Sequence, residues 1–202
     1  HNVIRNDTLD FDPYKKYGGV GARPEYKDGY WVVLQHPVTT EIEASRKQIE
    51  ITMAAMHIQK ETIFVFWPNV DAGADGTSTG IRSFREKHDL KKFHFFKNME
   101  PEDFLKLLYH SKGLVGNSSV GIRECSLMGV PTINIGTRQH MRVRGGNVID
   151  TSSDLHGILE SLRQIQNKTI TRSEIYGDGK AGEKIARVLS EVGLSFHKTI
   201  AY

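Results

Sequence analysis

Small polar side chains follow a short apolar run in "GLVGNSSVGIRECSLMGVP", residues 113–131. Asn117, Ser118 and Ser119 lie where a buried strand would turn into a helix. Their side chains can accept hydrogen bonds from the free N–H groups of a first helical turn. The same N–H groups and the positive end of the helix dipole also suit a phosphate. Position alone therefore supports simple capping and phosphate binding about equally.

Three charged residues could complete a nucleotide site around that turn. Glu124 lies six residues beyond Ser118 and could accept two sugar hydroxyls while a diphosphate occupies the helix start. Arg138 and Arg142 follow a later apolar run, and arginine can bind phosphate through two parallel hydrogen bonds. The alternative for all three residues is ordinary solvated charge.

His36 ends the apolar run of "YWVVLQHPVTT" and precedes Pro37. Proline disfavours the helical conformation in the residue before it, so the ring of His36 should stay at the end of the strand. A histidine there could donate a proton to a phosphate or a leaving oxygen near neutral pH. The chain has nine histidines, and position rather than residue type singles out this one.

Several tempting patterns do not meet the requirements of a site. "GGVGAR" lacks the third glycine of a dinucleotide fingerprint, and "DAGADG" lacks the distal glutamate of an EF-hand. The motifs HExxH, CxxC and GxSxG do not occur, and Cys125 is typical of a buried helix residue. We therefore expect no metal site and no cofactor.

Apolar, β-branched runs alternate with segments of helical periodicity from residue 30 onward. This alternation predicts an α/β fold with a Rossmann-like, doubly wound parallel sheet, whose ligands bind at the carboxyl ends of the strands. The predicted strands are 30–35, 62–69, 92–98, 112–117, 130–136 and 147–151. The predicted helices are 39–60 with Thr39 or Thr40 as cap, 78–88, 101–111, 120–129, 152–167 and 176–192.

Composition limits the class of protein. The 202 residues, 38% of them hydrophobic and 25% charged, suit one sizeable globular domain, and a net charge of +3 does not favour nucleic acid as a partner. A single cysteine and the lack of a membrane-length apolar run predict a cytoplasmic protein with no membrane partner. We expect residues 1–29 to be the end of an inter-domain helix and a linker, and the nucleotide-binding domain to span 30–202.

Five linked segments resemble the carboxyl-terminal half of hydrolysing UDP-N-acetylglucosamine 2-epimerases of the sialic-acid-pathway type. They are "HPVTTE", "FWPNVDAG", "GNSSVGIRE", "GVPTINIGTRQ" and "IYGDG", in the family's order and at about its spacing. The resemblance covers most of the chain from Tyr30. It implies the second domain of a glycosyltransferase-B-like fold, with a last helix at about 178–192 packing toward an amino-terminal domain, and a homo-oligomer, dimer or tetramer, at full length.

The resemblance also implies roles for individual residues. Ser118 and Ser119 would bind the diphosphate of a UDP-sugar, Glu124 its ribose and Arg138 the phosphate side. His36 would lie beside the diphosphate and the reacting sugar. The backbone near Met99 would meet the base. The remaining residues assigned to the nucleotide site are Asn69, Asp71 and Arg142.

The family's reaction is an anti elimination of UDP across C1 and C2, followed by addition of water to give N-acetylmannosamine. The acid and base carboxylates of that reaction lie in the family's amino-terminal domain, so we expect this chain alone to bind nucleotide without turnover. Three alternatives remain open: a GDP-linked sugar 2-epimerase of a nonulosonic acid pathway, a glycosyltransferase nucleotide-binding domain, and a non-catalytic nucleotide-sugar sensor. Many retaining glycosyltransferases carry a glutamate where this chain has Gly116, which disfavours the second.

Overall fold

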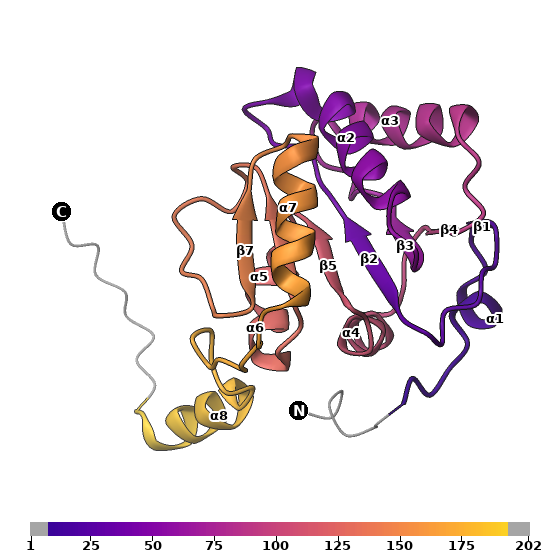
Figure 1. Cartoon of the computed structure of the whole chain (residues 1–202). Coiled ribbons are helices and arrows are strands. Elements are labelled where there is room, and N and C mark those ends of the chain that lie inside the picture. Colours follow the sequence, from indigo (N-terminus) through magenta and orange to yellow (C-terminus); the bar gives the residue numbers. More distant parts are fainter. Residues whose placement is uncertain (1–7, 194–202) are drawn as a thin grey trace.

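A parallel sheet forms the centre of the computed structural model, which describes residues 8–193 (Figure 1). The strands are β1 (Val20–Gly21), β2 (Tyr30–Leu34), β3 (Thr62–Phe66), β4 (Phe93–Phe96), β5 (Gly113–Gly116), β6 (Thr132–Ile135) and β7 (Val148–Thr151). Their order is β1-β4-β3-β2-β5-β6-β7, and only β1 runs antiparallel to its neighbour among these strands. The predicted doubly wound parallel sheet is confirmed.

Helices cover both faces of the sheet. On one face lie α2 (Ser45–His57), α3 (Ala74–Lys87) and α7 (Leu155–Gln166) (Figure 1). On the other face lie α1 (Pro13–Tyr17), α4 (Pro101–Tyr109), α5 (Ser119–Ile122) and α6 (Glu124–Met128). A short 3-10 helix, η2 (Ile42–Ala44), precedes α2, and α8 (Ala181–Glu191) follows the domain. No helix in the described range combines the length and apolar character needed to cross a bilayer.

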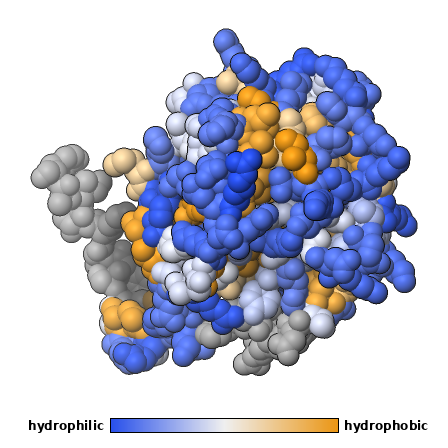
Figure 2. Space-filling model, viewed as in Figure 1, coloured by the Kyte–Doolittle hydropathy of each residue, from blue (hydrophilic) through white to orange (hydrophobic). Residues whose placement is uncertain are grey.

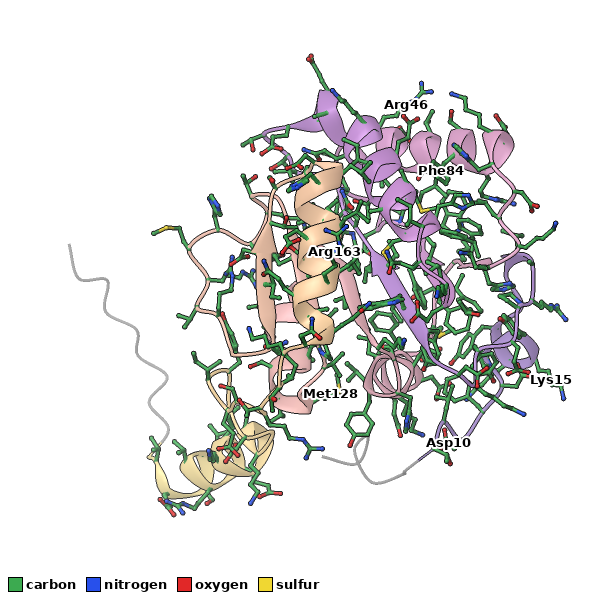
Figure 3. The ribbon with its side chains drawn as sticks, in the orientation of Figure 1. Asp10, Lys15, Arg46, Phe84, Met128 and Arg163 are labelled. Carbon is green, nitrogen blue, oxygen red and sulfur yellow. The ribbon has the colours of Figure 1, made fainter. Side chains whose placement is uncertain are left out.

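The strands β2, β3, β4 and β5 each contribute to two separate hydrophobic cores because successive side chains point to opposite faces. In β2, Trp31 and Val33 pack under α2, α3 and α7, whereas Tyr30 and Val32 pack on the α4 side. This double burial explains why the strands are apolar throughout rather than alternating. Figure 3 shows the arrangement of side chains around the sheet, with exposed Arg46 on α2 and Arg163 on α7.

The predicted helix 120–129 is interrupted, and that prediction is wrong in this respect. The backbone leaves regular helical geometry at Arg123, where φ is −96° and ψ is −73°. The carbonyl of Gly121 accepts hydrogen bonds from Thr132 Oγ1 and Asn147 Nδ2, at 3.1 and 3.0 Å. Two buried side chains thus draw this carbonyl toward the sheet, and α6 starts afresh at Glu124.

The predicted helix 39–60 also starts later than expected. Regular helix begins only at Ser45 after the 3-10 turn, and neither helix start has a side-chain cap. Thr39 and Thr40, the expected caps, instead line a pocket at the end of β2. The predicted cap is therefore wrong, and these residues belong to the site described below.

The described part of the segment before residue 30, expected to be a helix end and a linker, packs on the sheet. Tyr14 is buried and its hydroxyl donates to the carbonyl of Pro24 at 2.6 Å. The ring nitrogens of His94 on β4 lie 2.7 Å from the carbonyls of Gly18 and Ala22. This part of the segment packs on the domain, whereas residues 1–7 of the same segment lie outside the described residues.

The last described helix, α8, projects from the lower left of the molecule (Figure 1). Its residues are all exposed, and apolar atoms show on the surface in that region (Figure 2). The exposed apolar side chains on and just after it are Ile185, Val188, Leu189 and Val192. The expectation that this helix packs against another domain stays a prediction.

Candidate functional site

A pocket of about 670 Å³ lies beyond the carboxyl ends of β2 and β5. These two strands are neighbours at the point where the strand order reverses, which is where doubly wound sheets bind ligands. The walls of the pocket come from the loops after β2, β3 and β6 and from the first residue of α5. The lining residues are Pro37, Val38, Thr39, Thr40, Asp71, Ala72, Ser119, Thr137, Arg138, Gln139 and Arg142.

The close approach of β2 and β5 at this pocket depends on Gly116. Its φ is +144°, and a Cβ atom there would lie 2.1 Å from the carbonyl oxygen of Leu34. Only glycine fits this position without a backbone shift. The contact brings His36, two residues after β2, beside Asn117, which directly follows β5.

Asn117 is buried and its side chain clamps the main chain of His36. Asn117 Oδ1 accepts from the backbone N–H of His36 at 2.7 Å, and Nδ2 donates to the His36 carbonyl at 2.8 Å. Both residues are nearly inaccessible, at 2% and 4% exposure. The main chain of His36 is therefore held at the rim of the sheet, as predicted, although His36 is not among the residues that line the pocket.

The ring of His36 accepts a hydrogen bond, through Nδ1, from the backbone N–H of Asn69 at 3.4 Å. An accepting ring nitrogen carries no proton, so the neutral ring has its proton on Nε2. Burial and then the charge of Arg138 lower the pKa of His36 to about 4, with Asp71 opposing them. In the free protein His36 is thus a neutral hydrogen-bond donor at pH 7.

Arg138 is half-buried beside the same pocket. Its Nη2 lies 3.6 Å from a carboxylate oxygen of Asp71, and its Nη1 donates to the carbonyl of Asn117 at 3.4 Å. The next residue, Gln139, is buried and donates from Nε2 to that same carbonyl at 2.8 Å. Arg142 also lines the pocket and is exposed. Two guanidinium groups therefore give this pocket the charge that an anionic ligand needs.

Two interactions anchor the loop that carries these arginines. Arg144 donates from Nε to both carboxylate oxygens of Asp150, at 3.1 and 3.0 Å, and from Nη1 to the carbonyl of Gln139 at 2.9 Å. Burial raises the pKa of Asp150, but hydrogen bonds from Arg144 and Asn134 outweigh it, and the net shift is downward. These bonds tie the loop to β7.

The loop is tied to the opposite wall by Glu41. Thr137 Oγ1 donates to one carboxylate oxygen of Glu41 at 2.6 Å, and Gln48 Nε2 donates to the other at 2.6 Å. A single carboxylate therefore bridges the end of β6 and the start of α2. The loops around the pocket hold one another in place before any ligand binds.

The predicted diphosphate and ribose residues are only partly brought together. Ser118 is the N-cap of α5 but makes no capping hydrogen bond in the described chain, so its hydroxyl is available. Ser119 lines the pocket. Glu124 begins α6, is half-buried, and lies outside the set of lining residues. The ribose role of Glu124 stays a prediction.

Met99 and Asn69 also lie outside the lining of this pocket. Met99 is buried, and its N–H donates to Asn98 Oδ1 at 2.9 Å. Asn69 is exposed and lines a second pocket of about 910 Å³ on the α3 side, where Arg82 lies over the ring of Trp67. The structure thus leaves the predicted base contact at Met99 as a prediction.

Sequence reasoning missed two residues of the site as positioning groups. Asn117 was considered only as a helix cap, and Gln139 was not singled out. The signal available for both was a polar residue directly beside a predicted ligand residue, Ser118 or Arg138.

Among the described residues, no group of three or more His, Cys, Asp or Glu side chains could hold a metal ion.

Comparison with known proteins identifies the family. The family model described as UDP-N-acetylglucosamine 2-epimerase matches residues 12–190. The chain belongs to the UDP-N-acetylglucosamine 2-epimerase family. The match covers every described strand and all of the pocket.

Two relatives in this epimerase family are similar in sequence. A Neisseria meningitidis UDP-N-acetylglucosamine 2-epimerase is 35% identical over 81% of this chain and 41% of its own length. A Legionella pneumophila UDP-N,N'-diacetylbacillosamine 2-epimerase (hydrolyzing) is 30% identical over 95% of this chain and 47% of its own length. The chain spans less than half the length of these curated relatives.

A solved epimerase structure shares the fold. The Methanocaldococcus jannaschii UDP-GlcNAc 2-epimerase in complex with UDP-GlcNAc and UDP superposes with a TM-score of 0.61 at 18% identity. The superposition covers 81% of this chain and 46% of that one. The expected Rossmann-like domain of a glycosyltransferase-B-like epimerase is therefore confirmed.

Proposed function

We propose that the chain is the nucleotide-sugar-binding half of a hydrolysing UDP-N-acetylglucosamine 2-epimerase. The observation that carries this proposal is the pocket where β2 and β5 part, which is lined by Ser119, Arg138 and Arg142. His36 directly precedes the lining residue Pro37 and interacts electrostatically with Arg138. A diphosphate needs fixed cations and hydrogen-bond donors, and this pocket offers both. The relatives' lengths support an additional domain in the complete enzyme, toward which α8 would pack.

The proposed reaction begins when a base removes the C2 proton of the sugar. The electrons form the C1–C2 double bond, the bond from C1 to the UDP oxygen breaks, and a glycal remains. Water then adds across the double bond to give N-acetylmannosamine. Arg138 and Arg142 would offset the charge that develops on the leaving diphosphate, and Nε2–H of His36 would donate to one of its oxygens. The carboxylates that move protons would come from the other half of the enzyme.

The structure bears on one rival function. Many retaining glycosyltransferases carry a glutamate where this chain has Gly116, and a Cβ atom there would lie 2.1 Å from the Leu34 carbonyl oxygen. This backbone therefore has no room for that side chain. A GDP-linked sugar remains a rival substrate, and a non-catalytic sensor remains a rival role.

Nucleotide binding by this chain tests the proposal. We expect UDP at about 100 times its dissociation constant to add roughly 2.7 kcal/mol to the free energy of unfolding, which raises the melting temperature by several degrees. Arg138→Ala should abolish the UDP-induced rise, whereas Arg163→Ala, which removes an exposed arginine on α7, should keep it. Equal indifference to UDP, GDP and ADP would refute nucleotide binding. A larger response to GDP would favour the GDP-linked substrate. Release of UDP from UDP-N-acetylglucosamine by this chain alone would refute the proposal that the acid and base carboxylates come from the other half of the enzyme.

A further inference from the structure

We propose that Asn117 is a positioning residue that holds the imidazole of His36 and the guanidinium of Arg138 in one fixed frame. The inference rests on the proposed function, because it concerns the two groups that would meet the diphosphate. Neither Asn117 nor His36 is among the residues that line the pocket. Both polar atoms of the Asn117 side chain bond to the main chain of His36, so Asn117 would act through its neighbours rather than on the ligand.

The side chain of Asn117 extends the pairing of β2 with β5 beyond the last strand residues. The backbone N–H of Asn117 donates to the carbonyl of Leu34 at 3.2 Å, which is ordinary strand pairing. The backbone N–H of His36 then donates to Asn117 Oδ1 at 2.7 Å, and the His36 carbonyl accepts from Asn117 Nδ2 at 2.8 Å. Pro37 follows and has no N–H to continue the ladder. The amide thus fixes the main chain of His36 where backbone pairing ends.

The backbone of Asn117 fixes the other wall of the pocket. Its carbonyl accepts from Arg138 Nη1 at 3.4 Å and from Gln139 Nε2 at 2.8 Å. Ser118 and Ser119 come next in the chain, so a shift at residue 117 also moves the start of α5. One residue therefore sets the relative positions of the histidine, the arginine and the helix start.

Asparagine is the residue type that this position requires. The contact needs one acceptor and one donor on the same planar group, which an amide supplies. Aspartate keeps the shape and accepts from the His36 N–H, but its second oxygen would face the His36 carbonyl without a proton between them. Alanine removes both bonds and leaves two buried main-chain groups unsatisfied.

The test compares Asn117→Asp and Asn117→Ala with Asn147→Asp in the 202-residue chain. Asn147 is a matched control because it is equally buried and donates to two main-chain carbonyls, those of Gly121 and Val130, at 3.0 Å each. If Asn117 served only folding stability, its variants and Asn147→Asp should lower the melting temperature in the same way and should not differ in the His36 signals. The measurements are the UDP dissociation constant by calorimetry, the melting temperature, and the ¹⁵N signals of the His36 ring with and without UDP.

We expect both Asn117 variants to weaken UDP binding by about tenfold, the equivalent of one well-made buried hydrogen bond. The ring signals of His36 should change in the ligand-free chain as well, because the ring loses its fixed relation to Asn69. Asn147→Asp should lower the melting temperature and leave the ring signals of His36 unchanged. A folded Asn117→Asp or Asn117→Ala with wild-type His36 signals overturns the inference. If the wild-type chain binds no UDP, the proposed function fails while the ligand-free His36 signals still test Asn117.

Discussion

Arg138 Nη2 and a carboxylate oxygen of Asp71 lie 3.6 Å apart across the candidate pocket. The two side chains join the loop after β3 to the loop after β6. They are 29% and 40% exposed, so the pair contributes little to folding stability. The ion pair should weaken ligand binding, because a phosphate at Arg138 would compete with Asp71 for the same guanidinium.

Asp71→Asn should therefore tighten UDP binding. The amide keeps the shape of the side chain, releases Arg138 and removes a negative charge beside the diphosphate site. Exposed ion pairs are typically worth up to about 1 kcal/mol, so we expect a gain of roughly threefold to fivefold at low salt. Calorimetric titration with UDP measures the change.

Glu160→Gln is the matched control for that substitution. Glu160 forms an exposed ion pair with Arg163 on α7, at 3.3 Å, away from the pocket. Its replacement should leave UDP affinity unchanged. Weaker binding by Asp71→Asn would instead support the sequence-based assignment of Asp71 as a nucleotide ligand.

The sheet could be predicted from the sequence because its signals are local. Apolar runs of strand length alternate with helical segments, and the carboxyl ends of parallel strands must share one edge. That rule alone places His36, Ser119 and Arg138 in the same region, and the structure puts all three at one pocket or beside it.

The positioning contacts could not be predicted in the same way because they are not local. Asn117 clamps His36 across 81 residues of chain, which requires the register of β2 and β5 to be known. The break before α6 likewise depends on Thr132 and Asn147, which reach the carbonyl of Gly121 from later segments. Residue type and spacing place a polar residue, Asn117, beside Ser118, but they do not reveal which residue either contact reaches.

Met141 adopts a backbone conformation that its side chain disfavours. Its φ is 63°, the only positive value at a non-glycine residue in the described range, and its side chain is fully exposed. Asparagine tolerates this region better than other non-glycine residues. We expect Met141→Asn to raise the free energy of unfolding by about 0.5 to 1 kcal/mol, which chemical denaturation can measure.

Val143→Asn controls for the change in composition of that loop. Val143 is also exposed, but its φ is not positive, so asparagine relieves no strain there. The control should show no gain in stability. Equal gains from Val143→Asn and Met141→Asn would show that backbone strain at Met141 is not the cause.

Acid should destabilise the fold through His36. Its folded-state pKa of about 4 lies below the ordinary value of 6.5, so the unfolded chain binds more protons between these two pH values. The free energy of unfolding therefore falls as pH drops below 6.5, and the loss from this group is complete below pH 4. The loss is on the order of 3 kcal/mol. Urea unfolding at pH 7.5 and pH 5 should show about 2 kcal/mol of this loss, because part of it falls between pH 5 and pH 4.

His36→Gln removes the titrating group and should flatten that pH dependence, whereas His156→Gln, at an exposed histidine of α7, should not. A bound diphosphate favours the charged ring and raises the pKa of His36, so UDP affinity should increase as pH falls from 7 toward 5. The increase should vanish in His36→Gln. If His36→Gln keeps the wild-type pH dependence of both stability and UDP affinity, the imidazole neither titrates in the fold nor meets the diphosphate.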